Sequence, residues 1–176
     1  MSGICDGRVI IVTGAGGGLG REYALAFGAA GAKVVVNDIN AQSAQKTVVD
    51  IQNTGGQAIA NTQDITNYEQ SASIVSEAIA NFGDLHGVVN NAGICRDRMF
   101  ASMTEEEWDQ VIAVHLKGHF CISSHAVHYW RDQFKQGHKV DARIINTSSG
   151  AGLNGSIGQS NYAAAKGGIA SLTLNQ

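Results

Sequence analysis

Residues 8–38, RVIIVTGAGGGLGREYALAFGAAGAKVVVND, decide the fold of this chain. Arg8–Thr13 is a β-branched run that ends in glycines, which predicts a buried strand of a parallel sheet. Gly18–Ala30 carries apolar residues at helical spacing, and Lys33–Asn37 is a second β-branched run. A strand, a glycine-rich turn, a helix and another strand follow one another, which is the order in which a helix joins two parallel strands.

The same alternation continues along all 176 residues. Thr104 and Glu107 form a capping-box pattern at the start of one helix, and Ser160 is a candidate cap for the last helix. This alternation predicts an α/β fold, a doubly wound parallel sheet with helices on both faces, in one domain over residues 1–176. The remaining predicted helices are 40–53, 67–81, 104–133 and 160–176, and the remaining strands are 57–61, 85–90 and 143–147.

The composition excludes several classes of partner. Charged residues make up 15% of the chain, the net charge is −3 and no basic block is present, so we expect no nucleic-acid or membrane partner. The apolar runs are short, as at 34–36, so no segment is expected to span a bilayer. Cys5, Cys95 and Cys121 are odd in number and widely spaced, which favours reduced thiols in a cytoplasmic protein.

The glycine-rich turn is a candidate phosphate site. Glycines allow positive φ and let backbone amides approach a ligand closely, and the next helix presents unpaired N–H groups at its positive end. A pyrophosphate fits this combination, and a strand before and a helix after the glycines are the context that such a motif requires. The predicted cofactor-binding residues of the turn are Gly14, Gly17, Gly18, Leu19 and Gly20.

Asp38 follows the second predicted strand, 24 residues after Gly14 (38 − 14 = 24). A carboxylate at this point accepts hydrogen bonds from the adenosine ribose of a dinucleotide, and it repels the extra phosphate of NADP. Position 17 is glycine, so this position of the turn offers no arginine for that phosphate. These features favour NAD as the cofactor. The alternative is that Asp38 caps the helix that follows.

Residues 147–168, TSSGAGLNGSIGQSNYAAAKGG, place Ser149 thirteen residues before Tyr162 and Lys166 four residues after it. On a helix, a spacing of four puts the phenol and the ammonium on one face, about 6 Å apart. A free phenol has a pKa of about 10, and nearby positive charges favour its ionised form, which is a base. We therefore expect Tyr162 to exchange a proton with an alcohol, Lys166 to tune it, and Ser149 to bind the reacting oxygen. Tyr162 and Lys166 are also predicted to bind the cofactor, with Lys166 at the nicotinamide ribose hydroxyls. Ser148 is the rival for the serine role.

Three motifs in this order resemble the short-chain dehydrogenase/reductase family: TGxxxGxG at 13–20, NNAG at 90–93 and YxxxK at 162–166. The resemblance covers the whole chain, and VVVND, NNAGICRDRMF and VHLKGHF are most similar to the dehydrogenase unit of peroxisomal multifunctional enzyme type 2 and its bacterial relatives. It implies a Rossmann fold and hydride transfer between NAD and a secondary alcohol or ketone, a 3-hydroxyacyl-CoA or a hydroxysteroid. By the same resemblance, the cofactor also contacts Asp64, Ile65, Asn91, Ala92 and Gly93.

Several alternatives stay open. Residues 91–93 could be an ordinary strand-ending turn. The chain could be an NADPH-dependent 3-oxoacyl reductase or a non-catalytic nucleotide-binding module. His115 stands where most of the family has an asparagine that helps to pass the proton outward, so it is either catalytic or a buried structural residue.

Two further expectations concern metals and assembly. His115 and His119 have a metal-like helical spacing, as do His125 and His128, but no carboxylate accompanies them at a suitable position, so we expect no metal. The resemblance implies a homo-oligomer, a dimer or a homotetramer. It also implies that family members continue past the fifth strand and its following helix, so the substrate-covering part is expected to be absent from this chain.

Overall fold

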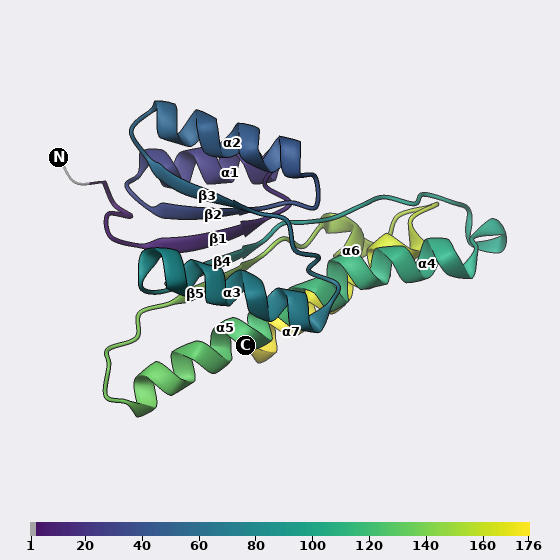
Figure 1. Cartoon of the computed structure of the whole chain (residues 1–176). Coiled ribbons are helices and arrows are strands. Elements are labelled where there is room, and N and C mark those ends of the chain that lie inside the picture. Colours follow the sequence, from purple (N-terminus) through teal and green to yellow (C-terminus); the bar gives the residue numbers. More distant parts are fainter. Residues whose placement is uncertain (1–2) are drawn as a thin grey trace.

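The computed structural model describes residues 3–176 and confirms the α/β fold. Within these residues, five strands form one parallel sheet in the order β3-β2-β1-β4-β5. Helices cover both faces of the sheet (Figure 1). The strands are β1 (Val9–Thr13), β2 (Lys33–Asn37), β3 (Gln57–Asn61), β4 (Gly87–Asn90) and β5 (Arg143–Asn146).

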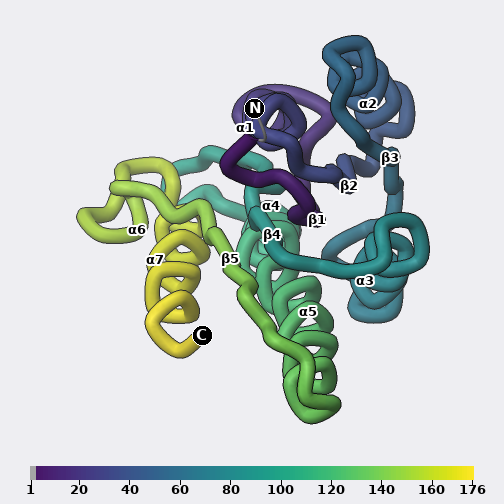
Figure 2. The backbone as a smooth tube through the Cα atoms, turned by 90° about the vertical axis from the view of Figure 1, so that its left-hand side faces the viewer, coloured from purple at the N-terminus to yellow at the C-terminus, as the bar shows by residue number. Residues whose placement is uncertain are grey.

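The helices form two layers around the sheet. α1 (Gly18–Ala29) and α2 (Ala41–Asn53) lie on one face, and α3 (Tyr68–Phe82) and α5 (Gly118–Lys135) on the other (Figures 1 and 2). The remaining helices are α4 (Glu105–Ile112) and α6 (Gly150–Asn154), which lie beyond the carboxyl ends of the strands, and α7 (Ser160–Asn175), which runs back beside β5.

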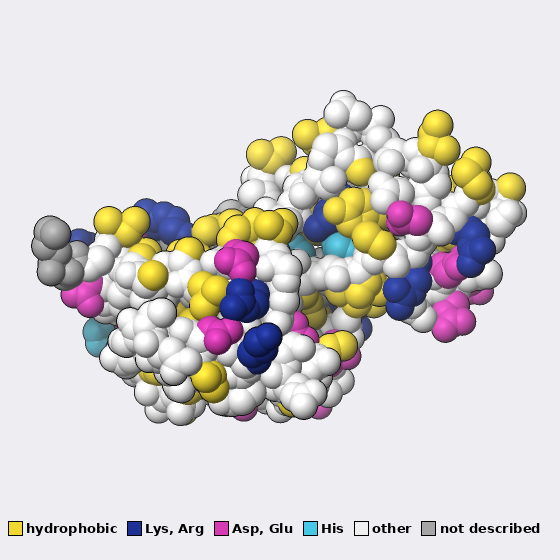
Figure 3. All heavy atoms as spheres, turned by 90° about the horizontal axis from the view of Figure 1, so that it is seen from above, with side chains coloured by type: hydrophobic (Ala, Val, Ile, Leu, Met, Phe, Trp, Pro, Cys, Tyr) yellow, Lys and Arg dark blue, Asp and Glu magenta, His cyan; other side chains and the backbone are white. Residues whose placement is uncertain are grey.

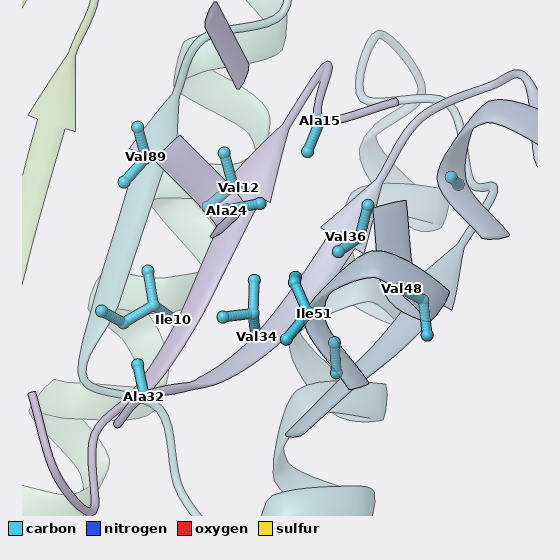
Figure 4. Packing of buried hydrophobic residues seen from close by; sticks show 12 residues of the cluster. Ile10, Val12, Ala15, Ala24, Ala32, Val34, Val36, Val48, Ile51 and Val89 are labelled. Carbon is cyan, nitrogen blue, oxygen red and sulfur yellow. The ribbon is translucent and has the colours of Figure 1, made fainter. Parts of the chain in front are cut away.

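The core is divided by the sheet because neighbouring residues of a strand point to opposite faces. Ile10 and Val12 pack with α1 and α2, in the cluster drawn in Figure 4. Val9 and Ile11 pack with α3 and α5. All five residues of β1 are buried, which explains why its sequence is a continuous apolar run and does not alternate with polar residues.

Every strand ends in a polar residue at the carboxyl edge of the sheet. Asn37 donates to Asn61 Oδ1 (2.8 Å), and Asn90 donates to Asn146 Oδ1 (2.8 Å). At this edge, the chain that follows β1 enters one layer of helices, and the chain that follows β4 leads to the other layer. A crevice between two such strands is where open α/β sheets bind ligands, so this edge positions the site.

The predicted helix over 104–133 is interrupted. Residues Ala113–Lys117 (η2) are π-helical and separate α4 from α5, an irregularity that the apolar spacing did not reveal. The capping box at its start is confirmed, since Thr104 and Glu107 exchange hydrogen bonds of 3.0 and 3.2 Å. The predicted cap at Ser160 is wrong, because Ser160 is already the first residue of α7 and Gln159 holds the cap position.

Two short elements were not predicted, α6 and a 3₁₀ helix at Phe100–Ser102 (η1). Both are shorter than two helical turns, so they contain too few residues to show a periodic pattern. In the part of the chain that the structure describes, no helix has the length and apolar character needed to cross a membrane.

Candidate active site

The glycine-rich turn joins β1 to α1 and faces the loop after β4. Gly14 has φ +63°, and a Cβ there would lie 2.7 Å from Ala92 Cα, so only glycine permits this approach of the two loops. At Gly17 and Gly18, by contrast, no described atom would lie within 4 Å of an added Cβ. The outer side of the turn is therefore open, and the first amides of α1 face a space that an anionic ligand can enter.

Asp38 is held in place by both carboxylate oxygens. Oδ2 accepts from the Gly16 amide (2.9 Å), and Oδ1 accepts from the Asn40 amide (2.9 Å). The residue that caps α2 is Asn40, whose side chain accepts from Ser43 N (3.0 Å). The alternative that Asp38 caps α2 is therefore wrong. The carboxylate instead ties the glycine-rich turn to the end of β2, with lone pairs left for further donors.

A cavity of about 590 Å³ opens beside Asp38. Asp64 and Ile65, two of the predicted cofactor-binding residues, line it. The Asp64 carboxylate accepts from Thr66 N (2.8 Å), and Ile65 is only 5% exposed because its side chain belongs to the core. One wall of this cavity is therefore the hydrogen-bonded turn after β3.

A second cavity, of about 450 Å³, adjoins the first and holds the residues of the tyrosine motif. Seen from above (Figure 3), the surface is hollowed between the sheet with its helices and the part formed by the later helices, and histidine side chains lie in this hollow. Gly17, Leu19, Asn91 and the pair Tyr162 and Lys166 line the second cavity. The two cavities share Gly14, Asp38, Ala92, Gly93 and Ile94.

Tyr162 and Lys166 lie on one face of α7, as the spacing predicted. The Lys166 ammonium nitrogen is 5.5 Å from the centroid of the Tyr162 ring and donates to Thr147 O (2.5 Å). Lys166 is only 2% exposed, and this burial lowers its pKa to about 8. The lysine is therefore a short-range positive charge beside the phenol, held by the end of β5.

His115 lies edge-on against the Tyr162 ring, with ring centroids 5.2 Å apart and planes at 89°. Its Nε2 lies 2.8 Å from Ile94 O and 3.1 Å from Ile94 N, so the tautomer decides which of the two it bonds. Burial lowers the pKa of His115, which favours the neutral ring. A Cβ at Gly93 would lie 2.3 Å from His115 Cε1, so this imidazole requires glycine at position 93.

The two candidate serines have different partners. The Ser148 hydroxyl donates to Lys166 O (2.9 Å), whereas Ser149 Oγ accepts from Ala151 N (3.2 Å) at the start of α6. Accepting leaves the O–H of Ser149 free to donate to another oxygen. Ser149 is not among the residues that line the 450 Å³ cavity in the described part of the chain, although Thr147, two residues earlier, is.

Three residues of this region were not predicted. Cys95 lines the same cavity as Tyr162, and His119 and Asn161 are completely buried. The one feature of the sequence that could have pointed to Asn161 is its position directly before the tyrosine. Among residues 3–176, no group of three or more histidine, cysteine or acidic side chains is placed to hold a metal ion.

Comparisons with known proteins identify the relatives of this chain. A family model described as short chain dehydrogenase matches residues 8–175. A hydroxyacyl-CoA dehydrogenase, ChsB1 of Mycobacterium tuberculosis, is 48% identical over 97% of this chain and 56% of its own length. The mouse peroxisomal multifunctional enzyme type 2 is 45% identical over 95% of this chain and 23% of its own length.

A solved structure is similar as well. A short chain dehydrogenase from Mycobacterium avium superposes with a TM-score of 0.96 at 56% identity, over 98% of this chain and 63% of that one. The chain thus spans less than two thirds of the length of these relatives. The family match over nearly every residue and the crevice that it contains lead to one conclusion: this chain belongs to the short-chain dehydrogenase family.

Proposed function

We propose that this chain is the cofactor-binding and catalytic part of an oxidoreductase that moves hydride between NAD and a secondary alcohol or ketone of a 3-hydroxyacyl-CoA. The observation that carries the proposal is the single cavity lined by the glycine-rich turn, Tyr162 and Lys166. Such a cavity brings a phosphate-binding surface and a proton-transfer pair within reach of one dinucleotide. The named relatives support the substrate class.

The cofactor fits the residues that are present. The open turn at Gly17 and Gly18 and the first amides of α1 would hold a pyrophosphate, and Asp38 would accept from the adenosine ribose hydroxyls. The turn at Asp64 would contact the adenine, and 91–93 would line the path to the nicotinamide. When bound, the oxidised nicotinamide accepts hydride from the alcohol carbon.

The chain's own residues would handle the proton. Tyr162 would take the hydroxyl proton in oxidation and return it in reduction. Lys166, buried 5.5 Å from the ring, would favour the negative charge that forms on the phenol. Ser149 would donate its free O–H to the substrate oxygen, whereas the Ser148 hydroxyl is already used by Lys166 O.

NAD is favoured over NADP because Asp38 is fixed at the adenosine side of the crevice by two backbone amides. A carboxylate that cannot turn away repels a ribose phosphate. The alternatives are a hydroxysteroid substrate, NADPH-dependent 3-oxoacyl reduction, and a module that binds nucleotide without turnover. The expected cytoplasmic location and the homo-oligomer remain predictions.

The test is NADH formation, followed by absorbance, from a 3-hydroxyacyl-CoA and separately from a hydroxysteroid. Tyr162→Phe should lower kcat by about 10²–10⁴-fold, the usual contribution of a positioned proton-transfer group. Tyr23→Phe, which alters a tyrosine of α1 outside the cavity, is the matched control. Full activity of Tyr162→Phe would remove the tyrosine from the mechanism, and NAD binding without turnover of either substrate would favour the non-catalytic module.

Cofactor choice is tested by titrating NAD and NADP separately. In Asp38→Ala, NAD affinity should fall and NADP affinity should rise, because one change removes an acceptor for the ribose and a charge that repels phosphate. An unchanged ratio of the two affinities would argue against this role.

A further inference from the structure

We infer that Asn161 is a positioning residue: its buried amide fastens the tyrosine-bearing end of α7 to the loop after β4 and to α4. This inference rests on the proposed role of Tyr162. It assigns a function to the residue immediately before the tyrosine, which none of the motifs includes.

The contacts of Asn161 use its whole amide group. Nδ2 donates to Arg96 O (3.1 Å) and to Glu107 O (3.1 Å), and Oδ1 accepts from Tyr162 N (2.7 Å). The side chain is 0% exposed. One residue therefore joins three separate elements, and one of its bonds is to the backbone of the tyrosine itself.

Neighbouring bonds join the same two segments. Arg98 N donates to Gly158 O (2.8 Å), and Arg98 and Gln159 form a parallel bridge. The Gln159 side chain donates to Asp97 Oδ2 (3.0 Å). Residues 96–98 and 158–161 together form what we call the clasp. The clasp is exposed at its outer bonds and buried only at Asn161.

The clasp matters because Tyr162 is the third residue of α7, where helices fray. The first amides of a helix lack helical partners, and Gln159 at the cap position provides no side-chain cap. Asn161 satisfies one of these amides and ties this first turn to two carbonyl groups outside the helix. Without it, the ring is free to move relative to Lys166 and the cofactor crevice.

The chemistry of the three partners selects asparagine. Two carbonyl oxygens require two N–H donors, and the Tyr162 amide requires an acceptor at the same side chain. Aspartate would place a carboxylate against two carbonyl oxygens in a buried site, and serine is too short to reach both. Alanine would leave all three groups without this partner.

The experiment compares Asn161→Ala and Asn161→Ser with Asn175→Ala, which removes an exposed asparagine of the same helix. We expect kcat of Asn161→Ala to fall about 10–100-fold, because small misplacements of a reacting group have effects of this size. KM for NAD should stay within about threefold, since the glycine-rich turn and Asp38 lie on other elements. Asn161→Ser, which retains an acceptor for the amide, should lie between Asn161→Ala and wild type.

Three readouts separate positioning from a merely structural role. The pH at which kcat/KM is half-maximal should rise in Asn161→Ala, because the phenol moves away from the ammonium. In the protein without substrate, the Arg98 amide should exchange with solvent about tenfold faster as the clasp opens. The His115 ring signals in NMR should also shift, because the Tyr162 ring lies edge-on to that imidazole.

The outcomes are distinguishable. Wild-type kcat, pH profile and amide exchange in both Asn161 variants would overturn the inference while leaving the proposed function intact. A lower melting temperature with unchanged kcat and pH profile would also overturn it. If Asn161→Ala does not fold, Asn161→Ser carries the same test. If wild type and Tyr162→Phe are equally active, the proposed function fails, whatever the Asn161 variants do.

Discussion

Replacing His119 with leucine tests how much one buried imidazole lowers the free energy of unfolding at acid pH. His119 lies on α5 and is 0% exposed, and neither ring nitrogen has a hydrogen-bond partner within residues 3–176. Burial lowers its pKa from 6.5 to about 3, and the positive charge of Lys166, together with that of His115 when it is protonated, acts in the same direction. The backbone carbonyls of His115 and Asn90 oppose this shift, but they do not outweigh it.

The size of the effect follows from proton linkage. Below pH 6.5 the unfolded chain binds a proton on this ring, whereas the folded protein does not until about pH 3. The unfolded state then binds more protons, so the free energy of unfolding falls as the pH drops from 6.5 toward 3. At pH 5 the interval is 1.5 units (6.5 − 5 = 1.5), which corresponds to about 2 kcal/mol.

Leucine binds no proton, so between pH 7 and pH 5 the free energy of unfolding of His119→Leu should fall by about 2 kcal/mol less than that of wild type. The assay is urea unfolding at a series of pH values, followed by the fluorescence of Trp108 and Trp130. His128→Leu, a change at an exposed histidine of the same helix, should behave like wild type. Equal losses in wild type and His119→Leu would refute the reasoning, since the ring would then be protonated or hydrated in the folded protein.

Three more predictions follow from the site. Burial lowers the pKa of Lys166 from 10.5 to about 8. The folded wild type therefore carries an unfavourable buried charge at pH 8 that is lost as the pH rises to 10.5. Over this range, the free energy of unfolding of wild type should rise by about 3 kcal/mol relative to that of Lys166→Met, measured by urea unfolding. The Arg98 hydrogen bond and the Thr104 amide lower the pKa of Glu107 to about 2. The melting temperature of wild type should therefore fall as the pH drops from 4.5 to 2, and that of Glu107→Gln should fall less over the same range. Gly93→Ala should cost about 1–3 kcal/mol through the clash with the imidazole, and a His115→Ala background should remove most of that cost.

Much of the fold could be predicted because β-branched runs and glycine-rich turns are local signals. The first strand was expected at 8–13 and is found at Val9–Thr13, and the tyrosine and lysine share a face of α7 as their spacing required. The position of Asp38 at the end of the second strand was also expected, whereas its bond to Gly16 N was not.

Other features depend on packing between residues distant in the chain. Asn161 donates to partners that lie 54 and 65 residues away in the sequence. A stretch of sequence around the tyrosine therefore does not include the residues that define its role. The burial of His119 depends on its helix facing β4, and its spacing from His115 gave no sign of that burial. The π-helical turn left no trace either, because apolar residues continue through it and only the hydrogen-bond pattern changes.

That π-helical turn makes the number of residues between α4 and α5 as important as their identity. Each residue of an α-helix advances the chain by about 100° around the axis. A π-helical turn spreads about the same rotation over one more residue, so loss of one residue within 113–117 would permit an uninterrupted helix with Ile122 and Ala126 still on the sheet and α4 still packed on α7, while His115 changed its position. A gap of a single position at this point would therefore spare both packed helices and displace the imidazole that lies against the Tyr162 ring.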